Sequence, residues 1–405
     1  MKNICLGIIL FACLLGACKR ENVTKEPKSF PISATQKMLI NAGNEFSFDL
    51  IKAIHQEEDA DKNLFFSPFS ISMALGMTLN GATGKTYEDM KSSLHLTSMS
   101  LSDINTSYKY LIDNLKPLDK DVVFTIANSI WYRQGYTIVP EFISNNQDYF
   151  YAQVNPLDFA KSEESKVTIN NWVKDKTNGK IEEIIDNIKP EDFMFLINAL
   201  YFNGQWTYKF EKSDTREMDF NLRNGDKVIT PFMFSKMNVK HVSNDLADAI
   251  ELPYGEGNFS MIVLVPQYNK NLDDLIEGFN STNWNYWISN LNLVEGMSVY
   301  LPKFTFDYEI ELKDILSSLG MSVAFSDMAD FSGINADLPL YISKVKHKGF
   351  VSVNEEGTEA AAVTSVGISF TSISQFAANK PFLFVIKERN TQSILFVGKV
   401  MKPVL

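Results

Sequence analysis

The chain has 405 residues, of which 45% are hydrophobic, 21% charged and 12% aromatic, and this composition excludes a disordered, collagen-like or polytopic membrane protein. A formal net charge of −11 at pH 7 argues against a nucleic-acid-binding protein, which needs a basic face to neutralise phosphates. The length suggests two or three domains, yet no second linker, repeat or low-complexity block interrupts residues 38–405.

The first segment has the pattern of an export signal. Lys2 precedes an uncharged, largely apolar run from Ile4 to Ala17, which is short for a bilayer-spanning helix but suits a secretory signal. The run ends in Leu-Gly-Ala-Cys18, which resembles the bacterial lipoprotein signal, where cleavage precedes a cysteine that then carries lipid. We therefore predict a signal peptide over residues 1–17, lipidation of Cys18, and a bacterial protein that is exported and lipid-anchored at the outer membrane or cell surface. The alternatives are an uncleaved anchor or a plain signal peptide.

The remaining cysteines, Cys5 and Cys13, lie inside the signal, so the mature chain has no disulfide. Residues 18–37 are polar, contain Pro27 and Pro31, and are predicted to form a flexible tether. Helical spacing follows at 46–54, and residues 70–79 read as a helix that is buried on all faces.

Further along the chain, residues 167–177 form an amphipathic pattern that ends at Asn178-Gly179, a plausible helix stop. The nearly continuous apolar run 193–202 predicts a strand buried on both faces. Residues 259–265 and 394–400 also read as strands. Because helices and strands alternate irregularly, we predict a single α+β domain over residues 38–405.

Enzyme signatures fail when their spacing is checked. The segment Gly81–Thr86 resembles a phosphate-binding loop, but that motif requires a glycine where the chain has Leu79, so a helix end followed by a helix start is the better interpretation. No Gly-x-Ser-x-Gly elbow occurs, and His55, His95, His241 and His347 form no metal motif. We predict no cofactor and no metal site. A Ser-His-Asp triad remains possible in principle, because its members can come from anywhere in a chain.

One segment departs from the average composition. Residues 360–379 contain no charged side chain, whereas a solvated loop normally carries several. Read with period two, one face carries Thr358, Ala360 and Ala362 and then β-branched residues, which suits a strand laid over a core. The flanking Glu-Glu-Gly and Asn-Lys-Pro sequences are typical of loop boundaries. The segment is therefore compatible with either a loop or a strand.

A series of motifs then occurs in one order along the chain, and together they resemble the serpin family. They are Asn63–Ile71 (NLFFSPFSI), Asn198–Trp206 (NALYFNGQW), Glu251–Tyr254 (ELPY), Leu301–Phe304 (LPKF), Asp330–Ile334 (DFSGI), Val353–Ala362 (VNEEGTEAAA), Lys380–Phe384 (KPFLF) and Phe396–Val400 (FVGKV).

The resemblance implies a fold with three β-sheets, about nine helices and an exposed C-terminal reactive-centre loop, over about residues 355–379. It implies a monomeric suicide-substrate inhibitor that forms a covalent complex with serine proteases, and not an enzyme. In that mechanism the protease cleaves the loop, and the loop then inserts into the main sheet before the acyl-enzyme is hydrolysed. The implied hinge comprises Glu355, Gly357, Thr358, Glu359, Ala360, Ala361 and Ala362, which are small or match the family's pattern.

The resemblance also implies roles for polar residues elsewhere. Ser67, Ser70, Asn198 and His347 match the cluster beneath the opening sheet, where the histidine has a gating and not a catalytic role. Trp206, Lys303 and Glu355 match positions where the loop enters the sheet, and we expect Glu355 to pair with a cation there.

The cleaved bond is predicted only as a range. Counting from the hinge places it after Thr371, and counting back from Asn379 places it after Phe370, while Ile368, Ser369 and Ser372 are further candidates. Because the run contains no Arg or Lys, chymotrypsin- or elastase-like targets are favoured. The alternative function is a non-inhibitory surface lipoprotein of the same fold with a binding role, and a secreted hydrolase is a third reading without a supporting motif.

Overall fold

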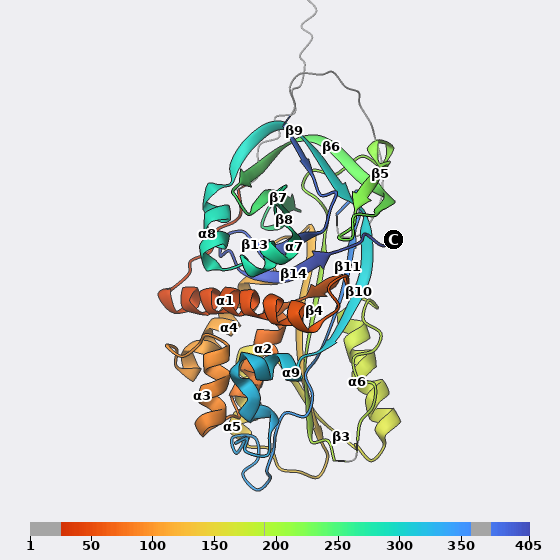
Figure 1. Cartoon of the computed structure of the whole chain (residues 1–405). Coiled ribbons are helices and arrows are strands. Elements are labelled where there is room, and N and C mark those ends of the chain that lie inside the picture. The colour runs from red at the N-terminus through yellow and green to blue at the C-terminus, as the bar shows by residue number, and fades with distance from the viewer. Residues whose placement is uncertain (1–25, 190, 358–373) are drawn as a thin grey trace, which may run out of the picture.

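The computed structural model describes residues 26–189, 191–357 and 374–405 (Figure 1). Within these ranges the chain forms nine α-helices, and Figure 1 shows most of them gathered in the half of the molecule below α1. They are α1 (Ala34–Glu57), α2 (Pro68–Leu79), α3 (Gly84–Ser93), α4 (Leu101–Leu115), α5 (Pro140–Phe150), α6 (Ser162–Lys176), α7 (Leu272–Glu277), α8 (Ser281–Asn290) and α9 (Lys313–Leu316).

The strands of the described residues form three sheets, which with the helices confirm the predicted α+β class. The nine-stranded sheet has the order β1 (Leu64–Phe66), β14 (Ile394–Val400), β13 (Phe382–Glu388), β8 (Phe259–Pro266), β7 (Ala247–Tyr254), β6 (Lys227–Ser243), β9 (Asn292–Pro302) and β12 (Gln375–Ala377), with β5 (Arg216–Asn221) also paired to β6. A three-stranded sheet contains β3 (Gln153–Leu157), β2 (Val122–Arg133) and β4 (Met194–Gly204), and a two-stranded sheet contains β10 (Phe304–Glu311) and β11 (Lys346–Val353).

Helix α1 begins earlier than the sequence analysis expected and shortens the tether predicted over residues 18–37. The Ser33 hydroxyl accepts a hydrogen bond from the Gln36 amide, and the Gln36 side chain accepts one from the Ser33 amide. This reciprocal capping box fixes the helix start although residues 34–37 have little apolar character. Upstream of the helix, Lys28 is also attached to the body, because its amide donates to Asn258 Oδ1 at 2.7 Å.

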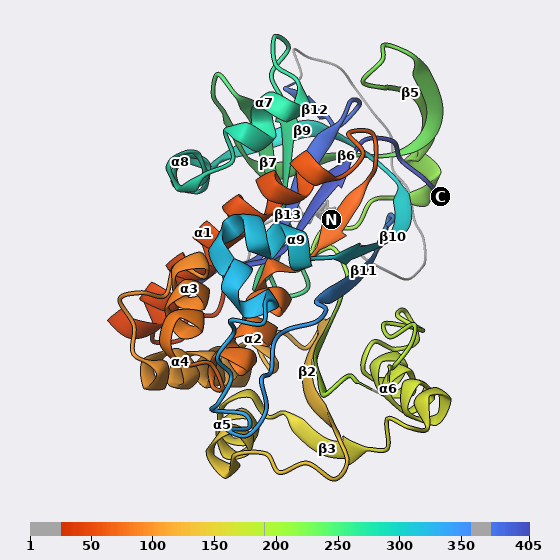
Figure 2. The same cartoon turned by 60° about the horizontal axis from the view of Figure 1, so that its bottom comes forward.

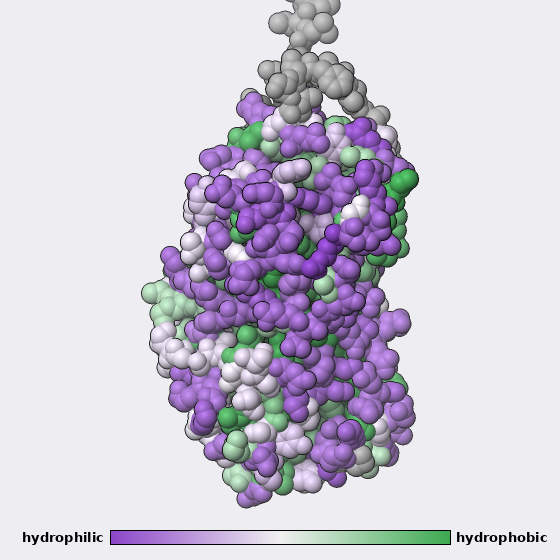
Figure 3. Space-filling view, in the orientation of Figure 1, coloured by the Kyte–Doolittle hydropathy of each residue, from purple (hydrophilic) through white to green (hydrophobic). Residues whose placement is uncertain are grey.

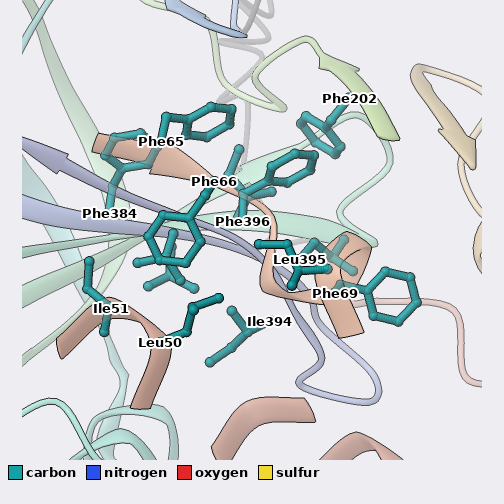
Figure 4. Packing of buried hydrophobic residues seen from close by; sticks show 14 of the residues in the cluster. Leu50, Ile51, Phe65, Phe66, Phe69, Phe202, Phe384, Ile394, Leu395 and Phe396 are labelled. Atoms are coloured by element: carbon teal, nitrogen blue, oxygen red, sulfur yellow. The ribbon is translucent and has the colours of Figure 1, made fainter. Parts of the chain in front are cut away.

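The main core lies between the large sheet, α1 and α2. Every residue of β8, β13 and β14 is buried, in agreement with the strands predicted at 259–265 and 394–400. Figure 4 shows aromatic side chains of β1 packed among those of β13 and β14. The Phe65 ring stacks on Phe396, with centroids 5.2 Å apart and planes 4° from parallel, and a second stacked ring, Phe384, lies 5.8 Å away. Such contacts join the short strand β1 firmly to β13 and β14 of the nine-stranded sheet.

Several local predictions are confirmed. Residues 70–79 lie in α2, in which all but one residue is buried, and the amphipathic pattern at 167–177 corresponds to α6. That helix ends where Asn178 and Gly179 adopt positive φ values of 50° and 78°. The segment Gly81–Thr86 is indeed a helix end followed by the start of α3. No helix among the described residues is long and apolar enough to span a bilayer, and the face in Figure 3 is mainly hydrophilic.

The prediction that the run 193–202 is buried on both faces is wrong for half of the strand. In β4, Ile197, Ala199, Tyr201, Phe202 and Gly204 are buried, whereas the other six residues are partly exposed. Figure 2 shows the reason in outline: the sheet lies between α6 on one side and the helices around α2 on the other, beside β10 and β11. Strands β4 and β11 belong to different sheets, and the space between them leaves part of β4 uncovered.

Candidate functional site

The candidate site is the gap between β4 and β11. A cavity of about 140 Å³ occupies its lower part, lined by residues 193–198 of β4 and its approach, by residues 340–347 leading into β11, and by α2. A smaller cavity of about 30 Å³ continues along the same two strands as far as Phe202 and Phe350. The lining of the larger cavity is mainly apolar, whereas that of the smaller one is mixed and includes Ser67, Asn198 and His347.

The two strands that flank the gap point in the same direction. Gln205, directly after β4, forms an antiparallel bridge with Gly357, four residues after the end of β11. The chain reverses between the end of β11 and Gly357. Because Gly357 runs antiparallel to Gln205, β11 itself runs in the same direction as β4. A strand that turned back from Gly357 would therefore run antiparallel to both neighbours and could bond to their facing backbone groups.

A tight turn at this end reverses the chain. The Asn354 amide donates to the Gly357 carbonyl at 3.0 Å, and the Gly357 amide donates back to the Asn354 carbonyl at 3.2 Å. Gly357 has φ +141°, and a Cβ there would lie 2.2 Å from the Gly204 carbonyl oxygen. Only glycine satisfies both conditions, because the positive φ and the contact with β4 leave no room for a side chain.

The predicted cation for Glu355 is Lys303. Its Nζ lies 3.0 Å from Glu355 Oε2, and the Thr215 hydroxyl donates to Oε1 at 2.8 Å. Burial opposes ionisation of this carboxyl, but a backbone hydrogen bond, Thr215 and Lys303 together hold the pKa of Glu355 below its usual range. The turn is thus charged in its interior and anchored to Thr215, directly before β5, and to Lys303, between β9 and β10.

Trp206 stabilises the turn through two hydrogen bonds to its backbone. Its amide donates to the Glu356 carbonyl at 2.7 Å, and its indole Nε1 donates to the Asn354 carbonyl at 2.9 Å. The ring stacks on Tyr254 with centroids 4.4 Å apart. The structure therefore brings Trp206, Lys303, Glu355 and Gly357 together at one end of the gap.

The predicted polar cluster lies along the gap, beneath its middle. Ser67 caps α2, its hydroxyl donates to the Leu395 carbonyl at 2.6 Å, and its amide donates to His347 Nε2 at 3.0 Å. The Ser70 hydroxyl donates to Asn198 Oδ1. Since burial disfavours the imidazolium, the pKa of His347 falls to about 4. His347 is therefore neutral at physiological pH, with its proton on Nδ1.

Two parts of the site were missed by the sequence analysis. Asn128 of β2 accepts from Asn198 Nδ2 at 2.6 Å and donates to the Phe150 carbonyl at 2.6 Å. Its signal was available, because it follows Phe124 and Ile126 at period two on a buried face. The second part is the connection from α6 to β4, which contributes Ile184 and Ile185 to the wall of the cavity.

This connection is attached to β11 by charge. Lys346 Nζ lies 2.5 Å from Asp186 Oδ2 and 2.7 Å from Glu309 Oε1, and Lys344 Nζ lies 3.6 Å from Asp186. The hydrogen bond and charge of Lys346 hold the pKa of Asp186 below its usual range. No sequence signal marks these pairs, because their members are ordinary charged residues far apart in the chain.

Several predicted residues lie outside the described ranges. They are Cys18, the hinge residues Thr358, Glu359, Ala360, Ala361 and Ala362, and the candidate bond residues Ile368, Ser369, Phe370, Thr371 and Ser372. Within the described ranges no group of three or more His, Cys, Asp or Glu side chains is placed to hold a metal ion. The other histidines pair with single aspartates: His55 with Asp273, His95 with Asp49 and His241 with Asp248.

The fold and the gap define a class of protein in which one more strand could join the three-stranded sheet at β4 to the two-stranded sheet at β11, and comparisons with known proteins agree. The family model described as Serpin (serine protease inhibitor) matches residues 41–403. A serpin-like protein of Thermococcus kodakarensis is 36% identical over 376 residues, covering 91% of this chain and 86% of that protein. The leukocyte elastase inhibitor of Sus scrofa is 33% identical, covering 91% of this chain and 100% of the inhibitor.

Solved structures show the same similarity. The native state of the thermophilic serpin tengpin superimposes with a TM-score of 0.82 at 33% identity, covering 94% of this chain and 97% of tengpin. Human thyroxine-binding globulin complexed with its hormone superimposes with a TM-score of 0.84 at 28% identity, covering 92% and 100%. The chain belongs to the serpin family.

Proposed function

We propose that this serpin is a suicide-substrate inhibitor of serine endopeptidases. The observation that carries the proposal is the turn at Asn354–Gly357, which reverses the chain after β11 and places Gly357 beside Gln205 at the end of β4. The residues that follow, beginning with Thr358 and Ala360, are small on one face and so suit a strand that must enter quickly. A chain with bulky or charged residues at these positions would enter slowly.

The chemistry of trapping uses the protease's own first half-reaction. The protease serine attacks the carbonyl of the loop bond, an ester forms, the peptide C–N bond breaks, and the proton leaves with the new amino terminus. The cut loop would then pair with the edges of β4 and β11, with the protease still esterified to its end. Strand β4 has 11 residues, so a strand of matching length spans about 36 Å. Movement on this scale would distort the protease before water completes hydrolysis.

Chymotrypsin- and elastase-like enzymes are the proposed targets. Residues 360–379 contain no basic side chain, which disfavours proteases with a trypsin-like pocket. Phe370 suits a chymotrypsin-like pocket, whereas Ile368, Ser369, Thr371 or Ser372 suits an elastase-like one. Two of the related proteins carry the name leukocyte elastase inhibitor.

The experiment is incubation of the purified protein with chymotrypsin and with elastase. We expect a complex that survives SDS and a released peptide that begins between residues 369 and 373. Replacing Thr358 or Ala360 with arginine should convert the inhibitor into a substrate. Cleavage of the unchanged protein without any stable complex would contradict the proposal.

A second candidate function is binding without inhibition. The fold is similar to that of human thyroxine-binding globulin, whose structures contain the hormone. The arginine variants separate the two functions, because a binding protein of this fold would keep its ligand affinity after Thr358→Arg, whereas an inhibitor would lose complex formation.

We further propose that the protein is a monomer, exported and lipid-anchored through Cys18 at a bacterial outer membrane or cell surface. The position of Lys28 gives this anchor an orientation. Lys28 Nζ lies 2.6 Å from Glu256, the neighbouring Gly255 amide donates to the Gln205 carbonyl at 2.7 Å, and Gln205 bridges Gly357. The ten residues from Cys18 to Lys28 span at most about 35 Å, so Lys28 and the adjoining end of the gap would lie within about this distance of the membrane.

Membrane fractionation and labelling with a radioactive fatty acid test the anchor. The unchanged protein should sediment with membranes and carry label, and Cys18→Ala should lose both. An unlabelled, freely soluble protein in the unchanged strain would contradict lipidation.

A further inference from the structure

Glu356, the second central residue of the turn, is buried and charged although the family resemblance assigns it no role. The residue is 4% exposed. Its Oε2 lies 3.3 Å from Lys209 Nζ and its Oε1 lies 3.5 Å from Lys212 Nζ. Oε1 accepts no hydrogen bond from any described residue, so the ion pair with Lys212 is its compensation for burial.

The two lysines belong to the segment that receives the turn. Lys209 and Lys212 lie just after β4, and between them Phe210 donates its amide to the Glu355 carbonyl at 2.9 Å. The Glu356 carbonyl accepts from Trp206 in the same segment. Backbone and side chain of Glu356 therefore hold the turn against the chain that follows β4, whereas the side chain of Glu355 pairs with Lys303, between β9 and β10.

We propose that Glu356 is a positioning residue for loop insertion. Its ion pairs with Lys209 and Lys212 keep the turn directed into the gap, and so favour insertion over hydrolysis of the acyl-enzyme. The inference rests on the proposed inhibitory function and adds a residue that sets the efficiency of trapping. In the absence of the charge, the turn still forms through its backbone hydrogen bonds but samples orientations in which Gly357 leaves Gln205.

The solvent exposure of Lys209 and Lys212 determines how strongly their ion pairs with Glu356 should depend on salt. The lysine side chains are 41% and 42% exposed, so water and salt screen their attraction for the buried carboxylate. A pair of this kind has a modest effect, and we expect its loss to raise the number of inhibitor molecules consumed per trapped protease by about threefold to tenfold. The same number should rise with ionic strength in the unchanged protein.

The test compares Glu356→Gln, the double variant Lys209→Gln/Lys212→Gln, and Glu217→Gln as a matched control. Glu217 is an exposed carboxylate on the neighbouring strand β5. The first two variants should raise the stoichiometry of inhibition by similar factors, and combining them should give no further increase. In both variants the stoichiometry should no longer depend on ionic strength. The rate of first cleavage should stay unchanged, and Glu217→Gln should behave like the unchanged protein.

A second measurement keeps this inference separate from the proposed function. A protease that is not trapped can cleave the loop, and tryptophan fluorescence then follows insertion, because Trp206 lies under the turn. Insertion should be slower in Glu356→Gln whether or not the protein traps its proteases. If both the stoichiometry and the insertion rate match the unchanged protein, the inference is wrong. If Glu356→Gln fails to fold, the same two measurements on Lys209→Gln/Lys212→Gln test the inference, since this variant alters only half-exposed side chains.

Discussion

The backbone amide of Ser67 donates a 3.0 Å hydrogen bond to Nε2 of His347, and this contact joins the N-terminal cap of α2 to the start of β11. The imidazole can accept this hydrogen bond only while Nε2 carries no proton. Protonation would therefore remove the acceptor and place a charge in a site that is closed to water. The link between helix and strand is sensitive to acid for this reason.

Stability should fall as the pH is lowered from about 6.5 toward 4. The pKa of His347 is depressed to about 4 in the folded protein, so the unfolded chain binds the proton first. The contribution is fully present above the unfolded pKa, and about 2 kcal/mol of it is lost by pH 5. Urea unfolding at pH 7.5 and pH 5 measures the change. His347→Gln can still accept from Ser67, and its stability should vary less over the same interval; an identical decrease would show that other groups are responsible.

Gly357→Ala should lower stability and impair trapping. The new Cβ would collide with the Gly204 carbonyl, and φ +141° is unfavourable for alanine, so we expect a loss of about 1–3 kcal/mol. The matched control is Gly225→Ala, which shares a positive φ of +89° but has open space around it. Equal losses in the two variants would show that the collision with β4 is unimportant. Urea unfolding and the stoichiometry of inhibition are the measurements.

Asp186→Asn should accelerate loop insertion. Asp186 holds the α6–β4 connection against Lys346 of β11, and this connection walls the cavity that the inserted strand would occupy. Because Asp186 is 55% exposed, its loss should leave global stability within about 0.5 kcal/mol. Insertion after loop cleavage should become about twofold to fivefold faster. Glu183→Gln, on the same connection and exposed, is the control, and equal rates in all three proteins would rule out the restraint.

Glu251→Gln, in β7, should destabilise the nine-stranded sheet without changing trapping. Burial would raise the pKa of Glu251, but Lys387 at 2.9 Å and Arg389 at 3.3 Å outweigh it and hold the pKa at about 2. Neutralising this carboxylate removes the anionic partner that the two buried cations share, and the expected loss is about 3–5 kcal/mol. The measurement is urea unfolding at pH 7, alongside the stoichiometry of the folded fraction. A loss under about 1 kcal/mol would mean that water compensates the cations.

The elements that the sequence predicted well are those with strong local patterns. Helix α2 has no polar face, and β8 and β14 are mainly apolar, with Ser260 and Lys399 as their polar members, so short-range patterning was enough to identify them. The start of α1 was missed although a Ser-x-x-Gln capping box marks it, because its first residues lack apolar spacing. The burial of β4 was overestimated, since apolar composition does not reveal that β11 is separated from β4 by a cavity.

By itself, the sequence determined the family, through motifs that occur in one order along the chain. Only the tertiary structure decided that β4 and β11 stand apart, that the turn before Gly357 faces the space between them, and that Glu356 meets Lys209 and Lys212 there. The physical reason is that patterning along a chain reports local conformation and burial. Strand separation and ion pairing depend instead on distances between residues that are remote in the chain.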